Sequence, residues 1–192
     1  TAFIVHGQSV ALHWDKKVKA WLPPGGHIET NEDPVQAVLR EVLEETGLMC
    51  EVVPTGESLE LAYPTQVDPP YTIMVEDIHD PIQGFHHHID MIYFCRPVAS
   101  MNSMVDGWQW VTKKQLMDGD SLLLDDGPAE PPPEDVQRLG GRAIEFISIS
   151  SLKSKPQTGI TGATPRIGLT HNPPNHIIAP NSSLVKRTEL TS

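Results

Sequence analysis

Three glutamates, Glu41, Glu44 and Glu45, follow closely on the glycine pair Gly25-Gly26 in this chain. At about 100° per residue, they fall on the side of a predicted helix that is opposite to its apolar residues. Acids three and four residues apart repel each other by roughly 0.2–0.5 kcal/mol per pair, and the last two acids also face the negative end of the helix dipole. A sequence that opposes local stability in this way indicates a functional site. Because hard divalent cations take oxygen ligands, binding of such a cation is the chemistry we expect.

The ends of this helix are predicted by its flanking residues. Asp33 is a good N-cap, Pro34 suits the first helical position, and Gln36 completes a capping-box pattern. Gly47 is a natural residue for the C-terminal cap. The apolar residues recur at helical spacing and predict a buried face, made of Val35, Val38, Leu39 and Val42. Arg40 lies beside the acids and can pair with one of them.

The spacing of residues 26–48 is more informative than the acids alone. The segment reads Gly, five residues, Glu, seven residues, then Arg-Glu-apolar-x-Glu-Glu-x-Gly-apolar. Every fixed place is filled, by Gly26, Glu32, Arg40, Glu41, Val42, Glu44, Glu45, Gly47 and Leu48. A solvated acidic helix face would not require this spacing. The segment resembles the Nudix box, the signature of the MutT-like Nudix hydrolase family.

The resemblance implies an α/β fold, the Nudix α/β/α sandwich, with a mixed β-sheet and the box as a loop-helix-loop. Outside the box the likeness is looser but extends over most of residues 1–147. Its parts are an opening hairpin (Ala2–Val5 and Val10–Trp14), a lead-in (Trp21–Gly26), a strand and helix (Gly107–Val111 and Lys113–Met117) and a closing helix (Glu134–Ile147). We therefore expect a Nudix hydrolase domain over residues 1–147.

The resemblance also assigns roles within the box. It implies Mg²⁺ or Mn²⁺ as cofactor, held by Glu41, Glu44 and Glu45, with the backbone carbonyl of Gly25 as a further ligand. Arg40 is counted with the catalytic glutamates, and it is expected to tie the loop to the helix through Glu32. The positions with a structural role are Gly26, Glu32 and Gly47. The expected activity is metal-dependent cleavage of a pyrophosphate bond in a nucleoside diphosphate linked to another moiety.

The substrate and the general base stay open at this stage. ADP-ribose, a nucleotide sugar, a dinucleoside polyphosphate and an oxidised nucleoside triphosphate all fit the resemblance. Candidates for the base are Glu44, Glu76, Asp90, Asp106 and Glu130. The alternative to an enzyme is a Nudix-fold domain that senses a nucleotide without cleaving it. Since a sensor has no need of the full set of box acids, and all are present, we favour the enzyme.

A histidine-rich segment, residues 86–90, reads His-His-His-Ile-Asp. In a strand, His86, His88 and Asp90 share one face, whereas His87 points to the other. Zinc requires ligands that converge, so this alternation argues against a site made of all three histidines. A strand that faces the substrate and an ordinary solvated strand are the other two interpretations, and His86, His88 and Asp90 are candidate substrate residues under the first of them.

Composition separates a body from a tail. Residues 1–147 hold 9 basic and 24 acidic residues, and residues 148–192 hold 5 basic and 1 acidic residue. The acidic body gives no support for general binding of long nucleic acids, which requires Lys and Arg to neutralise phosphates, so we expect a small nucleotide-like substrate and no long nucleic acid. Residues 148–192, rich in Ser, Thr, Pro, Gly and Asn, are predicted to be a disordered tail.

The remaining expectations concern the location and assembly of the protein. The two cysteines, Cys50 and Cys95, lie in apolar contexts without a CxxC pattern and are predicted to be reduced. This prediction suits a cytoplasmic protein. No apolar stretch is long enough to span a membrane, so no membrane partner is expected. The assembly is open, with a homodimer among the forms considered.

Overall fold

The computed structural model describes residues 1–98, 103–124, 127–128 and 130–153. The chain opens with an antiparallel hairpin of β1 (Ala2–His6) and β2 (Ser9–Asp15), as predicted. Gly7 occupies the turn with a φ of +60°, a conformation in which glycine has no Cβ penalty. The hairpin forms the centre of the sheet that positions the site.

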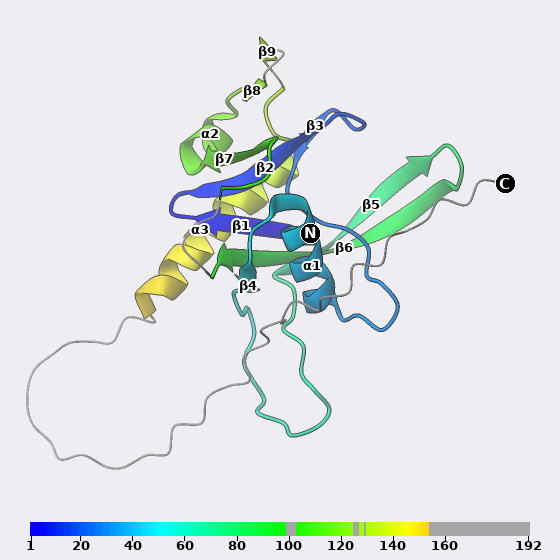
Figure 1. The fold of residues 1–192 in the computed structure, drawn as a ribbon, viewed down its shortest axis with the longest axis vertical. Helices are drawn as coiled ribbons and strands as arrows, with labels where there is room; N and C mark the ends of the chain where they lie inside the picture. The colour runs from blue at the N-terminus through cyan, green and yellow to red at the C-terminus, as the bar shows by residue number, and fades with distance from the viewer. Residues whose placement is uncertain (99–102, 125–126, 129, 154–192) are drawn as a thin grey trace, which may run out of the picture. The chain divides into compact units, whose positions relative to one another are not determined.

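A mixed seven-stranded sheet is built around this hairpin (Figure 1). Its main order is β3-β2-β1-β6-β4, with β5 paired to β6 and β7 paired to β2. The added strands are β3 (Ala20–Leu22), β4 (Cys50–Val52), β5 (Thr72–Asp80), β6 (Gly84–Pro97) and β7 (Trp108–Thr112). The β1–β6 pair is parallel and the other pairs are antiparallel. A separate small ladder joins β8 (Leu123–Leu124) to β9 (Gly127–Pro128).

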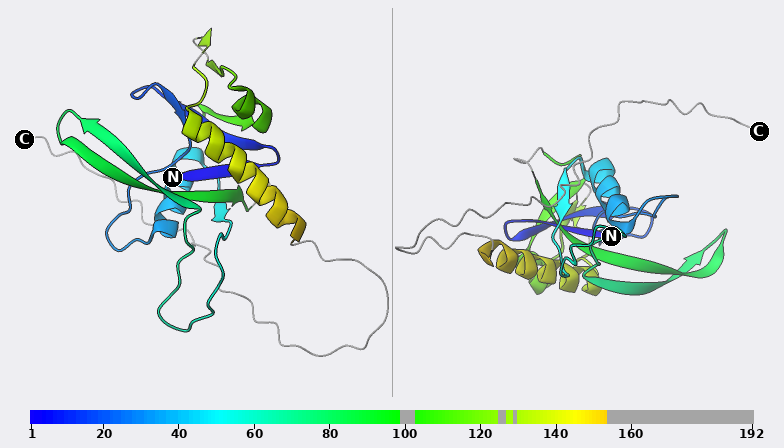
Figure 2. Two further views of the ribbon diagram at one scale, coloured as in Figure 1. Left: turned by 180° about the vertical axis from the view of Figure 1, so that it is seen from behind. Right: turned by 90° about the horizontal axis from the view of Figure 1, so that it is seen from below.

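Two helices pack on opposite faces of the sheet, with α1 (Pro34–Thr46) on one side and α3 (Glu134–Lys153) on the other (Figure 2). Alternate residues along β1 explain the two layers. Ile4 belongs to a core with Val42 of α1, whereas Phe3 belongs to a second core with Ile144 of α3. The short α2 (Lys113–Asp118) follows β7. The predicted α/β/α sandwich is therefore confirmed.

The predicted ends of the box helix are confirmed. The Asp33 side chain accepts hydrogen bonds from the backbone of Val35 and Gln36, and the Gln36 side chain accepts one from the backbone of Asp33. Gly47 caps the other end with a φ of +73°. These caps fix both ends of the helix that carries the glutamates.

The closing helix is longer than expected, because α3 runs to Lys153 rather than ending at Ile147. Most of the predicted tail, residues 154–192, lies outside the described residues. The division at residue 147 therefore remains a prediction. Within the described part of the chain, no helix is long and apolar enough to cross a membrane.

The cysteines behave as expected for reduced residues. Both are free, with Cys95 buried in β6 and Cys50 partly buried in β4. Burial raises the pKa of the Cys50 thiol to about 12, so this thiol stays protonated at neutral pH.

Candidate active site

Arg40 holds the box together by joining its loop to its helix. Its guanidinium donates two hydrogen bonds to the Glu32 carboxylate, at 2.9 and 3.0 Å, and one to the backbone carbonyl of His27 at 3.0 Å. It also contacts Glu41 at 2.7 Å and Glu44 at 3.3 Å. The carboxylates of Glu32 and then Glu41 raise the pKa of Arg40, so the cation is permanent. The expected tie between loop and helix through Glu32 is present.

Gly26 lets the loop approach the helix closely. A Cβ built at this position would overlap the carboxylate of Glu41. Gly25 makes the matching approach one residue earlier, where its backbone N–H donates to Glu45 Oε2 at 3.3 Å. The two glycines thus bring the backbone against two carboxylates one helical turn apart.

The three acids of the box are not equivalent. All three lie away from the apolar face of the helix, but 61% of the Glu44 side chain is exposed, against 17% of that of Glu41. Arg40 pairs with Glu41 and, at a longer distance, with Glu44, so the repulsion expected among the three acids is partly offset. Among the described residues, Glu45 forms no ion pair.

The pKa of Glu45 reflects its partial burial and its negative neighbours. Burial raises the pKa of Glu45, the hydrogen bond from Gly25 opposes the rise, and the charges of Glu41 and Glu44 add to it. A half-buried carboxylate with negative neighbours is a group that a cation would stabilise.

The donor set of the box suits a hard divalent cation. Glu41 and Glu45 supply oxygens next to Gly26 and Gly25, and Mg²⁺ prefers such ligands to nitrogen or sulfur. In the part of the chain that the structure describes, no three His, Cys, Asp or Glu side chains converge tightly enough to hold a metal by themselves. The box residues thus fit the cation in chemistry, and the remaining ligands would have to come from backbone, water or substrate.

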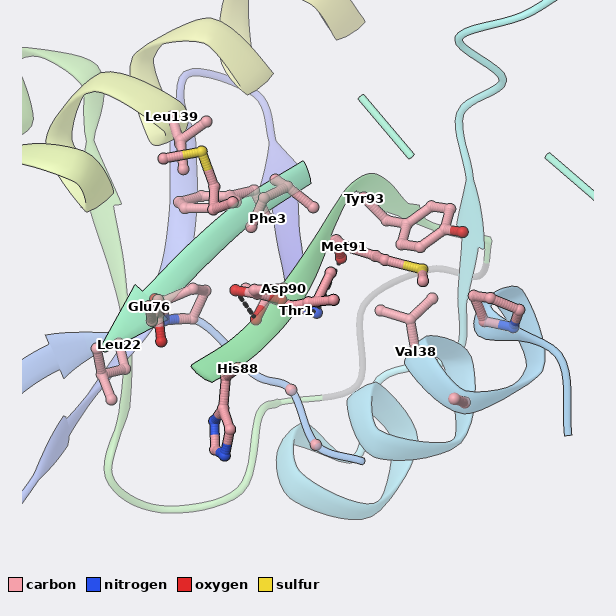
Figure 3. Close-up of a pocket in the computed structure, with 18 of the residues that line it drawn as sticks. Thr1, Phe3, Leu22, Val38, Glu76, His88, Asp90, Met91, Tyr93 and Leu139 are labelled. Carbon is pink, nitrogen blue, oxygen red and sulfur yellow. Dashed lines mark hydrogen bonds and ion pairs between the residues drawn. The ribbon is translucent and has the colours of Figure 1, made fainter. Parts of the chain in front are cut away.

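An open cleft of about 800 Å³ lies beside the box loop (Figure 3). One wall consists of residues 25–28 with Val38 of α1, and the other of the β5–β6 hairpin. The glutamates of the box do not themselves line it: Glu41 and Glu45 lie against the Gly25-Gly26 segment that does. A ligand in the cleft would therefore meet the glycine backbone between itself and these acids.

The hairpin wall carries several of the predicted residues. Glu76, His88 and Asp90 line the cleft, and Glu76 lies opposite His88 in the register of the two strands. Asp90 accepts a hydrogen bond of 2.8 Å from the Thr1 hydroxyl. Burial raises the pKa of Glu76, and the charges of Asp90 and Asp135 raise it further, against a smaller opposing effect of His88.

Two candidates are placed elsewhere. Asp106 is exposed in the turn before β7, and Glu130 is exposed ahead of α3. Neither is among the residues lining the cleft. His86 does not line it either, but its ring is hydrogen-bonded to that of His88, which does.

Sequence reasoning missed His27, whose carbonyl accepts a hydrogen bond from Arg40 and whose ring lies 5.5 Å from that of His88. Its position directly after the glycine pair was the available signal.

The geometry agrees with the comparisons to known proteins. Residues 2–132 match the family model for the NUDIX domain. A solved NUDIX-family hydrolase from Clostridium perfringens is 26% identical and has a TM-score of 0.62, covering 77% of this chain and 95% of its own.

Two curated relatives match over a short segment only. Both are named m7GpppN-mRNA hydrolase NUDT17. The protein from Danio rerio is 64% identical over 28 residues, and that from Xenopus laevis is 54% identical over 33 residues. These matches cover 15% and 17% of this chain, and 9% and 11% of the two relatives. The family model, by contrast, spans every strand of the sheet, α1, and the residues that line the cleft except Thr1 and those of α3. The match of the family model over residues 2–132, together with the box and the α/β/α sandwich, shows that the chain belongs to the NUDIX domain family.

Proposed function

We propose that the protein is a metal-dependent hydrolase that cleaves a pyrophosphate bond in a nucleoside diphosphate linked to another moiety. Hydrolases of the Nudix family generally use divalent metals and act on small nucleotide-like substrates. The observation that carries the proposal is the placement of Glu41 and Glu45 against Gly25-Gly26 at the edge of the cleft.

The box residues divide the work between them. Glu41 and Glu45 would hold Mg²⁺ or Mn²⁺, together with Glu44 and the carbonyl of Gly25. The cation, when bound, neutralises phosphate charge and acidifies a water molecule. Arg40 keeps Glu41 in its place while leaving the Glu45 carboxylate to the cation. Because the pKa of Glu45 is raised, cation binding has to compete with a proton there.

Glu76 is the base candidate that the structure favours. An effective general base has a pKa near the working pH, and burial moves the pKa of Glu76 upward in that direction. Glu76 also lines the cleft, as does Asp90, whereas Asp106 and Glu130 do not. Glu44 remains the alternative within the box, where its exposed carboxylate can reach a water molecule.

The substrate belongs to the class of nucleotides with a phosphoanhydride link. The members of this class whose cleavage should be compared are ADP-ribose, nucleotide sugars, dinucleoside polyphosphates and oxidised nucleoside triphosphates. The two short matches are to proteins named as hydrolases of m7GpppN-mRNA, so a cap dinucleotide belongs in the same comparison. The acidic body gives no support for binding a long nucleic acid. A cytoplasmic location and a homodimer remain predictions.

A substrate panel tests the proposal. The full chain is incubated with each compound in Mg²⁺, and phosphate or mononucleotide release is measured beside a Glu45→Gln variant. We expect at least one compound to be cleaved by the native protein, with a rate that collapses in the variant. Tight binding of a nucleotide with no cleavage by either protein would instead identify a sensor. Equal cleavage by both would place the chemistry outside the box.

A further inference from the structure

A pair of histidines on β6 forms a second cluster with metal-binding chemistry, separate from the box. His86 and His88 lie two residues apart on one side of the strand, and their Nε2 atoms are 3.2 Å apart. Two imidazole nitrogens that share a tetrahedral zinc ion, each at about 2.0–2.1 Å, lie about 3.3 Å from each other. The separation needed for chelation therefore exists before any ion is bound.

The hydrogen bonds of His86 point its free nitrogen toward His88. His86 Nδ1 lies 3.1 Å from the carbonyl oxygen of Gly84, and because a carbonyl only accepts, Nδ1 must donate. In the neutral ring, this leaves Nε2 with its lone pair directed at His88. Metal-bound histidines commonly fix the other ring nitrogen in this manner. A cation bound by both Nε2 atoms would take the place of the hydrogen bond between them.

The surroundings attract a cation. The paired part of the hairpin, residues 72–92, contains four acids, Glu76, Asp77, Asp80 and Asp90, and no lysine or arginine; Arg96 follows further along β6. Glu76 lies directly opposite His88 in the strand register, and Asp80 lies within electrostatic reach of His86. These carboxylates are not close enough to complete a site of three or more side chains among the described residues. Water or a phosphate oxygen would fill the remaining coordination positions of the ion.

We propose that His86 and His88 form a two-imidazole binding site for a divalent transition-metal cation such as Zn²⁺, on the wall of the cleft and distinct from the carboxylate site of the box. Imidazole nitrogen suits Zn²⁺ and Cu²⁺, whereas carboxylate oxygen suits Mg²⁺, so the two sites select different ions. His88 lines the cleft, and an ion bound there would add positive charge opposite the box loop. The site does not depend on the hydrolase activity.

The neighbouring residue supplies a matched control. His87 occupies the other side of the same strand, where its Nε2 lies 3.2 Å from Asp77. It has the same side chain and a more exposed position, but among the described residues it has no imidazole partner at chelating distance. The chain has nine histidines, so weak binding elsewhere is expected and only the comparison of variants identifies the site.

The test is a Zn²⁺ titration of the full chain by calorimetry in excess Mg²⁺, without nucleotide. We expect the native protein and His87→Ala to share one tight site, and His86→Ala and His88→Ala each to bind at least tenfold more weakly at that site. With Cu²⁺ as the probe, electron paramagnetic resonance of the native protein should show two coordinated nitrogens, and one fewer in His88→Gln. Equal binding by all variants, or an equal loss in His87→Ala, would overturn the proposal. Circular dichroism establishes that each variant is folded.

Discussion

Gly26 leaves open the space that the Glu41 carboxylate occupies, since a Cβ at this glycine would overlap that carboxylate. The contact joins the loop before the helix to the first acid of the helix. A side chain at this position would force Glu41 to move, and the far end of a glutamate moves easily. The cost of a substitution should therefore appear in function more than in folding.

Gly26→Ala is the test of this relationship. We expect the fold to be kept and kcat/KM to fall by at least about tenfold, which corresponds to roughly 1.4 kcal/mol of barrier, because Glu41 is displaced from the cleft edge. Gly141→Ala is the control, since a Cβ there meets only the Met117 sulfur at an ordinary distance of 3.5 Å. If both variants retain native kinetics, the close approach has no catalytic role.

Arg40→Lys tests the tie between loop and helix. Lysine keeps the charge but loses the two-pronged contact with Glu32 and the geometry that reaches Glu41 and the His27 carbonyl. We expect a loss of roughly 1–3 kcal/mol in the free energy of unfolding, measured by denaturant titration. The matched change Arg96→Lys alters the geometry of an exposed ion pair with Glu51 and should cost about 0.5 kcal/mol or less. Equal losses would mean that the box contacts add no stability.

The box could be predicted from sequence because its information is local. Asp33, Gln36 and Gly47 determine the helix ends through contacts within a few residues, and the spacing of the acids follows from the helix. The partners of those acids could not be predicted in the same way. Whether Arg40 pairs with Glu41 or Glu32, and how deeply Glu45 is buried, depends on how the loop folds over the helix.

The far wall of the cleft depends on long-range pairing. Alternation in residues 86–90 predicted which histidines share a face, and the 3.2 Å contact of His86 and His88 agrees with it. The length of the β5–β6 hairpin and the place of Glu76 opposite His88 follow from a strand register that local sequence does not specify. Which of the base candidates line the cleft therefore could not be predicted from the sequence, and the identity of the base stays a prediction.

Glu76→Gln tests the favoured base. If Glu76 takes up a proton during the reaction, its loss should lower kcat by about a hundredfold or more and should remove the acidic limb of the pH–rate profile. That limb should lie above the ordinary glutamate range, because burial raises the pKa of Glu76. Asp106→Asn, outside the cleft, is the control and should leave the profile unchanged. If the pH–rate profile of Glu76→Gln keeps the acidic limb of the native protein, Glu76 is not the base and Glu44 becomes the candidate to test.

Removing residues 154–192 tests whether the described part of the chain is the whole catalytic unit. The cut follows Lys153, the last residue of α3, and takes away none of the residues that line the cleft. We expect turnover and melting temperature to stay close to those of the full chain. A cut after Ile147, which removes the last six residues of α3, is the contrasting variant. A large loss from the shorter deletion would show that the tail docks on the domain.

The last prediction concerns Glu45, where proton binding and cation binding compete. Its folded-state pKa is raised above the ordinary value of 4.5, so the folded protein holds this proton more tightly than the unfolded chain does. The contribution of Glu45 to stability therefore falls as pH rises from the ordinary value through the raised one, and stays unfavourable above it. In metal-free protein at neutral pH, Glu45→Gln should melt higher than the native protein, and the difference should shrink as pH is lowered through that window.

Cation binding should reverse this order. Mg²⁺ that binds only the folded protein stabilises it by about 2.7 kcal/mol at a hundred times its dissociation constant, and the gain should grow with pH as Glu45 loses its proton. Glu45→Gln should lose most of the gain, and activity should fall on the order of a thousandfold, because one ligand charge is missing. Thermal melts of the native protein, Glu45→Gln and the triple Gln variant of Glu41, Glu44 and Glu45, with and without Mg²⁺, give the comparison. If Mg²⁺ raises the melting temperature of the triple variant as much as that of the native protein, the ion binds outside the box. If the metal-free Glu45→Gln variant is less stable than the native protein, the Gly25 hydrogen bond outweighs the burial of the charge.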